Sequence, residues 1–316
     1  MTMVKMAEAG GGDRGFLRVQ VINIQNNFPI QDARVSVSYK GDPGRPLEQV
    51  MTDASGQTER LALSAPPKSY SLAPGMEQPY SEYNLMVTAP GFEPQEVSGT
   101  EVLSGTTALQ PVRLKPAGEG LPPESPVVIP DHTLYGYYPP KIAEEEIKPV
   151  SESGEIVLSR VVVPETVIVH DGVPTDSSAP DYYVPYRDYI KNVASSEIYA
   201  TWPQATITAN ILAIMSFTLN RVYTEWYRNK GYDFTITSST AFDHKWIYGR
   251  NIYDSISQVV DEIFSDYLSR PEVKQPILTQ YCDGRRVMCP GWMAIPRVRI
   301  HGEKPYFTRL SGDSVR

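Results

Sequence analysis

Residues 184–231, VPYRDYIKNVASSEIYATWPQATITANILAIMSFTLNRVYTEWYRNKG, contain the longest predicted helix of the chain. Thr201 and Gln204 have capping-box spacing, and Pro203 between them is tolerated in a first helical turn, so the helix is expected to begin near Pro203. Apolar residues then cover more than one narrow stripe, which predicts burial on most sides. Gly231 is the expected C-terminal stop. This helix is therefore predicted to form the spine of a hydrophobic core.

A shorter helix is predicted just before it, over YRDYIKNVASSE, ending near Glu197. A carboxylate at a helix C-terminus faces the negative end of the helix dipole, and the apolar neighbours Ile198, Tyr199 and Trp202 add a desolvation cost. Both effects raise the pKa of a carboxyl group, as a general acid working near neutral pH requires. From these residues alone the simpler interpretation, a solvated glutamate at a helix end, is favoured.

A family resemblance reverses that preference. The pattern YIKNVASSE, a short connection and a long Ala/Ile-rich helix resembles stage II sporulation protein D and the related LytB amidase-enhancer domains. In that family the equivalent glutamate is the catalytic acid of a peptidoglycan lytic transglycosylase, which implies this role for Glu197. The resemblance spans residues 15–293 and is most specific over 184–292.

Four segments, NVASSEIYATWP, SFTLNRVYTEWYRNKGYDF, TITSSTAFD and QYCDG, are closest to a clostridial and bacillary subgroup of that family. Its members often carry a β-sandwich before this domain and peptidoglycan-binding modules after it. Tyr281 stands where the family has a Tyr-His-Ser-x-Ser-Gly-Gly segment, which implies a position in the substrate cleft. The histidine and the glycine pair are missing here, and Met215-Ser216-Phe217 replaces the family's Arg-Thr-Tyr run.

Two further residues, Ser239 and Thr240, are candidate substrate-binding residues because they form a hydroxyl cluster with Ser238. Such clusters are usually turns and caps, and sometimes contact sugars. Ordinary glycosidases use two carboxylates, but Asp188, nine residues before Glu197, points the opposite way on a continuous helix.

A lytic transglycosylase needs only one acid. It protonates the glycosidic oxygen, and the muramic C6 hydroxyl then attacks C1 to leave a 1,6-anhydro end. The favoured function is therefore cleavage of peptidoglycan glycan strands, linked to sporulation or cell-wall remodelling. One alternative is a non-catalytic wall-binding protein or an enhancer of a wall amidase. Another is a structural spore or phage-like component in which the sandwich is the working part.

The charge and hydropathy of the chain argue against nucleic-acid and membrane partners. The formal net charge is -8 and no block of basic residues occurs, which argues against nucleic acid and against an anionic membrane surface. No apolar run is long and pure enough for membrane insertion. The segment MTMVKMAEAGGGDRG has no apolar core of a signal peptide. The protein is thus expected to be soluble, made in the cytoplasm, and to act at the cell wall or spore after release.

No cofactor is expected, because no Gly-rich phosphate loop of the Walker or Rossmann type occurs. Cys282 and Cys289 have three interpretations: a zinc site, a disulfide formed after export, or two free thiols. Zinc requires four ligands, and no histidine has a tight spacing to these cysteines, so free thiols are favoured and no metal is predicted. The histidines are His132, His170, His244 and His301.

The predicted architecture is multidomain: an all-β sandwich of the transthyretin or immunoglobulin type followed by an α+β domain. The sandwich is indicated by short alternating strands with Gly and Pro between them, and it resembles carboxypeptidase regulatory-like domains. The Pro-rich linker is expected to be kept solvated by Glu144-Glu145-Glu146. The predicted parts are a disordered N-terminus 1–14, the sandwich 15–115, the linker 116–160, the sporulation-protein-D-like domain 161–292, and a divergent or frameshifted tail 293–316.

Within the second domain the alternation of apolar residues predicts further elements. A strand is expected over 161–169 and another over 232–237. A helix is expected over 254–269, ended by Pro271, and a strand over 276–281.

Overall fold

The computed structural model describes residues 12–72, 77–118, 125–132, 134, 139, 141, 142, 144, 158, 160–271, 273–282, 293–294 and 306–309, and from residue 281 onward only the backbone. The chain forms two compact units. The first comprises Met1–Asp131, Tyr199–Trp202 and Tyr248–Ser255. The second comprises His132–Ile198, Pro203–Ile247 and Ile256–Arg316.

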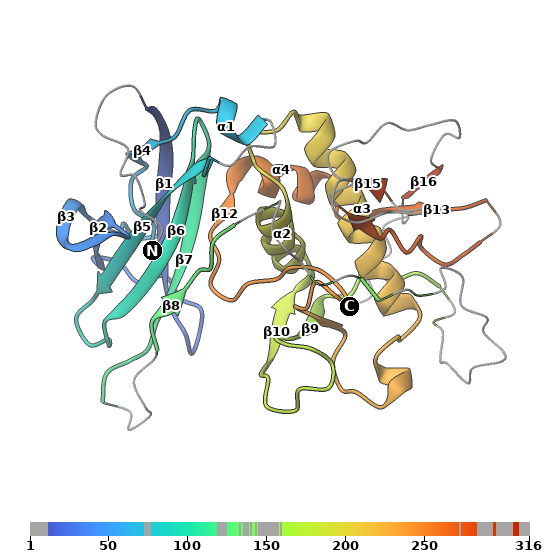
Figure 1. The fold of residues 1–316 in the computed structure, drawn as a ribbon. Coiled ribbons are helices and arrows are strands. Elements are labelled where there is room, and N and C mark those ends of the chain that lie inside the picture. The colour runs from blue at the N-terminus through green and yellow to red at the C-terminus, as the bar shows by residue number, and fades with distance from the viewer. Residues whose placement is uncertain are drawn as a thin grey trace. The chain divides into compact units, whose positions relative to one another are not determined.

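The first unit is a β-sandwich of two sheets (Figure 1). One sheet has the strand order β12-β7-β1-β4 and the other β3-β2-β5-β6-β8. The bounds are β1 Asp13–Asn23, β2 Arg34–Tyr39, β3 Asp42–Met51, β4 Leu61–Ala65, β5 Tyr80–Thr88, β6 Gln95–Leu103, β7 Thr107–Leu114, β8 Val127–Val128 and β12 Ile252–Tyr253, with a short helix α1 at Ser69–Leu72. The predicted all-β sandwich is therefore confirmed.

The core of the sandwich is formed by alternate residues of its strands, whose side chains point inward. In β1 the side chains of Leu17, Val19 and Val21 are fully buried, while the residues between them are partly exposed. Strand β1 pairs antiparallel with β4 and parallel with β7. Hydrogen bonds also join the two sheets: Tyr83 in β5 donates to the carbonyl oxygen of Ser64 in β4 at 2.6 Å.

The sandwich extends past residue 115, the end predicted for it. Strand β8 pairs in parallel with β6, and the next residue, Ile129, is fully buried. A Cβ atom on Gly99 (φ +92°) would lie 2.4 Å from the carbonyl oxygen of Ile129, so a glycine is required where the two segments cross. Part of the predicted linker is thus a sandwich strand. With only two paired residues, this strand is too short to show an alternating pattern in the sequence.

A late segment of the chain completes the first unit. Strand β12 pairs antiparallel with β7, and Arg250 just before it forms a bidentate ion pair with Glu101 of β6 at 3.0 and 2.6 Å. Both side chains are fully buried. Asn251 accepts a hydrogen bond from the backbone N–H of Glu101 at 3.0 Å and donates to its carbonyl oxygen at 3.1 Å. The residues around Arg250 are therefore part of the sandwich.

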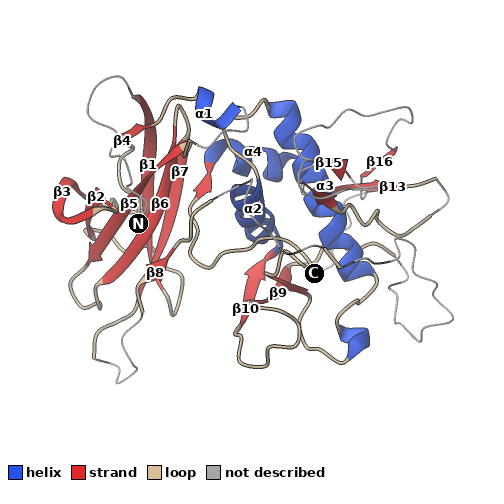
Figure 2. Ribbon diagram, viewed as in Figure 1, coloured by secondary structure: helices blue, strands red, loops and turns tan. Residues whose placement is uncertain are grey.

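The second unit is a mixed α+β structure (Figure 2). A three-stranded sheet has the order β10-β9-β11, β13 pairs antiparallel with β16, and β14 pairs in parallel with β15. The bounds are β9 Thr166–His170, β10 Asp181–Pro185, α2 Tyr186–Glu197, α3 Gln204–Tyr223, a 3-10 turn Arg228–Lys230, β11 Ile236–Thr237, α4 Asp254–Ile263, β13 Asp266–Ser269, β14 Tyr281–Cys282, β15 Met293–Ala294 and β16 Tyr306–Arg309.

Helix α3 is the buried spine that the sequence predicted, and it begins as expected just after Pro203. The predicted cap is wrong, because Pro203 is the N-cap and offers no side-chain hydrogen bond. Thr201 instead donates to the hydroxyl of Ser71 at 2.6 Å within the first unit. The hydroxyl that could have capped the helix is thus engaged elsewhere.

The predicted C-terminal stop of α3 is also displaced. The helix ends at Tyr223, followed by Glu225 with a left-handed φ of +48°. Gly231 (φ +83°) caps the separate 3-10 turn. Glycine is the expected residue at such a position, but the left-handed Glu225 had already ended the α-helix.

The strands expected over 161–169 and 232–237 are found at Thr166–His170 and at Ile236–Thr237. Two further element predictions need correction. The helix expected over 254–269 ends at Ile263, because Asp266–Ser269 form strand β13 and pair with β16. The strand expected over 276–281 is limited to Tyr281–Cys282. Both differences arise from pairing with segments beyond residue 292, which local periodicity does not encode.

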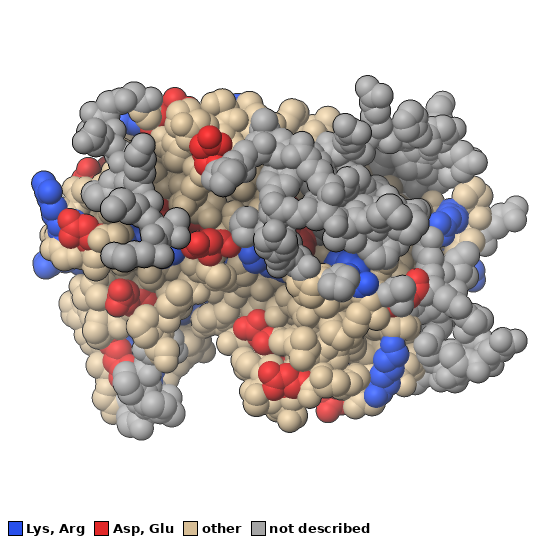
Figure 3. Space-filling view, in the orientation of Figure 1, with Lys and Arg blue, Asp and Glu red and all other residues tan. Residues whose placement is uncertain are grey.

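Among the described residues, no helix is long and apolar enough to cross a membrane. On the face drawn in Figure 3, acidic and basic side chains are scattered over the described surface rather than gathered by sign.

Candidate active site around Glu197

Glu197 is the last residue of α2, as predicted, and its carboxyl group is held against the loop that follows β11. The backbone N–H of Lys245 donates to Glu197 Oε1 at 2.7 Å. The other oxygen, Oε2, is buried and accepts no hydrogen bond from the described residues. The residue as a whole keeps some exposure, but the carboxyl group is not the solvated helix end that the sequence alone favoured.

Burial is the main influence on this carboxyl group. Desolvation raises the pKa of Glu197 from an ordinary 4.5 to about 7, against the opposing effects of the Lys141 ammonium, the Lys245 hydrogen bond and the Lys245 charge. A carboxyl group with a pKa near neutrality is protonated in a useful fraction of molecules at physiological pH. It can therefore donate a proton to a leaving oxygen.

A buried ionic cluster adjoins Glu197. Arg221 of α3 makes a bidentate pair with Glu144, at 2.6 Å for each bond, and its Nε lies 2.7 Å from Asp243 Oδ1. Lys141 adds a second cation and donates to the backbone oxygen of Asp243. Two cations thus face two carboxylates. Burial nevertheless lowers the pKa of Lys141, since its charged form loses hydration.

Asp243 organises the loop that holds Glu197. Its Oδ2 accepts hydrogen bonds from Tyr227 at 2.6 Å and from the backbone N–H and hydroxyl of Thr237 at 2.9 and 2.7 Å. With Arg221 on Oδ1, both oxygens are engaged. Asp243 is therefore a structural anchor, and the N–H that binds Glu197 follows only two residues later.

His244 is fully buried between the anchor and Lys245. Its ring lies 4.5 Å from the Phe217 ring, and its Nδ1 is 3.4 Å from the Tyr189 hydroxyl. Burial, followed by the charges of Lys141 and Arg221, lowers its pKa well below the ordinary 6.5. The imidazole is therefore neutral near physiological pH.

The other predicted site residues lie in different settings. Ser239 is half-buried in the turn before Asp243, where its carbonyl oxygen accepts the N–H of Asp243 at 2.7 Å, and Thr240 follows it in the same turn. Both belong to the loop that carries Lys245, and no described contact joins either to Glu197. Asp188 is exposed in the first turn of α2, at the opposite end from Glu197.

Tyr281 lies in β14, one residue after Gln280, whose side chain donates to the carbonyl oxygen of Ile142 at 3.5 Å. Ile142 also donates its N–H to Ala241 O at 2.9 Å, so the backbone at Tyr281 is close to the same loop. The side chains of Tyr281 and Cys282, and all of Cys289, lie outside the described residues. The cleft role of Tyr281 and the state of the cysteines stay predictions.

Sequence reasoning missed the residues that surround Glu197. Glu144 was assigned to a solvated acidic run, but only 5% of its side chain is exposed. Its partner is 77 positions away, and Asp243 is 102 positions from Lys141. One signal was available: Arg221 is a charge inside an apolar helix, and a buried arginine requires a carboxylate partner.

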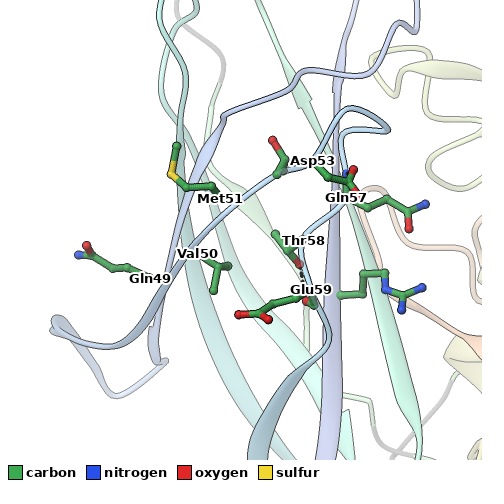
Figure 4. Close-up of a pocket in the computed structure, with 9 residues that line it drawn as sticks. Gln49, Val50, Met51, Asp53, Gln57, Thr58 and Glu59 are labelled. Atoms are coloured by element: carbon green, nitrogen blue, oxygen red, sulfur yellow. Dashed lines mark hydrogen bonds between the residues drawn. The ribbon is translucent and has the colours of Figure 1, made fainter.

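A hollow of about 660 Å³ lies on the surface of the sandwich (Figure 4). Its one aspartate, Asp53, accepts hydrogen bonds from Ser55 and Gln57 within its own turn. That carboxylate is therefore used within its own turn. The lining residues are Arg18, Gln49, Val50, Met51, Thr52, Asp53, Gln57, Thr58 and Glu59.

No protein-family model matches the chain. A comparison with curated proteins finds no match either. Solved structures give partial matches. Klebsiella pneumoniae 5-hydroxyisourate hydrolase is 20% identical over 33% of this chain and 92% of its own, with a TM-score of 0.22. GBS52, the minor pilin of Streptococcus agalactiae, is 14% identical over 36% of this chain and 49% of its own, with a TM-score of 0.24.

The Bacillus anthracis TIE protein is 15% identical over 33% of this chain, with a TM-score of 0.23, and the matched part spans 17% of that protein. Scores this low carry no argument about function. The β-sandwich itself rests on the strand pairing described above.

Proposed function

We propose that the protein is a lytic transglycosylase that cleaves peptidoglycan glycan strands to 1,6-anhydro-muramic ends, with Glu197 as the acid. The observation that carries this proposal is the buried Oε2 of Glu197, which has no hydrogen-bond partner among the described residues, in a carboxyl group whose pKa is about 7. The family resemblance supports it independently. In this proposal the second unit is a domain of the stage II sporulation protein D type, and the first is a transthyretin-type sandwich.

The reaction uses Glu197 twice. Its carboxyl proton passes to the glycosidic oxygen as the bond from that oxygen to muramic C1 breaks. The C6 hydroxyl oxygen of the same sugar then bonds to C1, and its proton returns to the Glu197 carboxylate. No water enters the product, and the acid is regenerated in its protonated form.

A single acid fits the described surroundings better than a carboxylate pair. Ordinary glycosidases place two carboxyl groups about 5–10 Å apart across the scissile bond. Asp243 and Glu144 are the carboxylates of the adjoining cluster. Both oxygens of Asp243 accept hydrogen bonds, from Arg221, Tyr227 and Thr237. Both oxygens of Glu144 accept hydrogen bonds from Arg221. Neither carboxylate is therefore suited to activate water or to attack the sugar. Attack on C1 by the C6 hydroxyl of the substrate itself requires no second carboxylate.

The runner-up function is a non-catalytic wall-binding protein or amidase enhancer. The specific observation in its favour is that Glu197 Oε2 is buried, so a substrate cannot reach it without a rearrangement. Under this alternative the protein releases no anhydro product, yet it binds peptidoglycan or stimulates an added wall amidase.

Glu197→Gln is expected to abolish glycan cleavage while the fold and wall binding remain. The amide keeps the shape of the side chain but cannot donate the proton, and loss of a general acid typically costs about a hundredfold to ten-thousandfold in rate. Purified peptidoglycan is digested with wild type and variant, and anhydro-muropeptides are measured by mass spectrometry.

Asp188→Asn is the matched control, because it removes an exposed carboxylate from the same helix. It is expected to cleave at the wild-type rate. Cleavage that survives Glu197→Gln would show that the acid is another residue, and Glu225 would be tested next. Absence of anhydro products with wild type, together with wall binding or amidase stimulation, would favour the enhancer function.

A further inference from the structure

Three described residues from the predicted linker, Lys141, Ile142 and Glu144, lie against the Glu197 site and are called the strap below. We propose that the strap is an autoinhibitory element, which covers Glu197 and must detach before a glycan strand can reach the acid. This inference rests on the proposed function and adds a resting, closed state to it.

Backbone hydrogen bonds, a side-chain hydrogen bond and an ion pair hold the strap in place. The N–H of Ile142 donates to Ala241 O at 2.9 Å, and its carbonyl oxygen accepts from the Gln280 side chain at 3.5 Å. Glu144 makes the bidentate pair with Arg221 of α3. The strap is therefore joined to the loop that holds Glu197, to the segment before β14 and to the spine helix.

Lys141 relates the strap to the acid through its charge. Its ammonium group is the largest charge opposing the effect of burial on the Glu197 carboxyl group, and it also donates to Asp243 O. A cation beside the carboxyl group favours the carboxylate, the form that cannot donate a proton. The docked strap therefore acts against the acid electrostatically as well as by covering it.

The contacts of Arg221 allow the strap to leave without loss of the site. After Glu144 departs, Arg221 keeps Asp243 as a buried partner at 2.7 Å. Asp243 in turn keeps its bonds from Tyr227 and Thr237, so the loop that carries Lys245 remains anchored. The strap carries one cation and one carboxylate, so its release leaves the net charge of the remaining site unchanged.

The test measures access to Glu197 in Lys141→Met and Glu144→Gln. Each protein is treated with a water-soluble carbodiimide and glycine ethyl ester at one common pH of about 5. Amide formation at Glu197 is followed by mass spectrometry of its peptide. We expect at least about tenfold faster labelling in both variants than in wild type, and faster release of anhydro-muropeptides.

Glu262→Gln is the matched control, because it removes an exposed carboxylate that accepts a hydrogen bond from Gln258 on its own helix. It should label Glu197 at the wild-type rate. Circular dichroism shows whether a variant is folded, and if Glu144→Gln is unfolded, Lys141→Met decides alone, since it leaves the Glu144–Arg221 pair intact.

Equal labelling of Glu197 in wild type, control and folded strap variants would overturn the strap inference, even if all of them cleave glycan. Faster labelling with no anhydro product from any protein would support the strap and overturn the proposed transglycosylase activity. The labelling rate thus tests the strap, and the release of anhydro-muropeptides tests the proposed activity.

Discussion

At the scale of single residues, the central feature is a carboxyl group that is buried at a cost to stability. Glu197 has one oxygen bound by Lys245 N–H and one without a partner among the described residues. A structural role would favour a fully paired or an apolar side chain here. Proteins tolerate such unsatisfied groups mainly where function requires them, which is consistent with the proposed acid.

The pH dependence of stability should reveal this group. The folded pKa of Glu197 is about 7, above the ordinary 4.5, so the folded state binds more protons than the unfolded state between these values. Stability therefore falls as pH rises through this window, by about 3 kcal/mol at about 1.4 kcal/mol per pKa unit. Glu197→Gln should remove that loss, so its advantage over wild type grows from pH 4.5 to pH 8.

Urea unfolding at several pH values measures the difference. Asp188→Asn is the control, because it removes an exposed carboxylate from the other end of the same helix. Parallel curves for wild type and Glu197→Gln would mean that the carboxyl group is hydrated in the folded state.

At the scale of elements, α3 organises its neighbours through polar side chains as well as apolar ones. Ser216 donates to Leu212 O within the helix and accepts the N–H of Leu268 in β13 at 2.7 Å. Asn220, one turn further, donates to Pro276 O at 2.7 Å. The position that departs from the Arg-Thr-Tyr pattern of the resembled family thus has a structural use here.

Ser216→Ala should destabilise the protein by about 1–3 kcal/mol, because the N–H of Leu268 loses its partner. Ser196→Ala is the matched control: Ser196 is also a buried helical serine, but among the described residues its hydroxyl bonds only to Asn192 O of its own helix. Chemical denaturation of both variants should therefore show a clearly smaller loss for Ser196→Ala. Equal losses would indicate that β13 does not depend on α3.

The elements that the sequence predicted well are those specified locally. The burial of α3 and its start after Pro203 follow from periodicity and from the proline, and α2 ends at Glu197 as predicted. The sandwich strands follow from alternation. The prediction failed where a distant segment decides, as in β13, whose partner is Tyr306–Arg309. Glu197 was found through family resemblance and helix position, whereas Lys141 and Glu144 were not, because their contacts lie far away in sequence.

At the scale of the whole molecule, the two units are not consecutive halves of the sequence. The first unit includes Tyr199–Trp202 and Tyr248–Ser255, both of which interrupt the second. Arg250 supplies the only cation that the described residues place on the buried Glu101 carboxylate. A fragment that stops at residue 131 therefore lacks the arginine that pairs with this fully buried carboxylate.

Arg250→Met should cost about 3–5 kcal/mol, the usual range when one member of a buried ion pair is removed. The double variant Glu101→Gln/Arg250→Met should regain part of that loss, because it removes the unpaired charge as well. Thermal unfolding of the two variants and wild type completes the comparison. A double variant less stable than Arg250→Met alone would show that the charge on Glu101 is not the source of the cost.

The same ion pair sets an order of events during protein synthesis. Glu101 and Arg250 are 149 positions apart, so at about 5–20 residues per second a ribosome adds the arginine roughly 7–30 s after the glutamate. Through that interval the nascent sandwich has an unfilled edge beside β7 and a carboxylate without its cation. The first unit to emerge is thus completed only after most of the second has been translated, and a chaperone has that interval in which to bind the open edge.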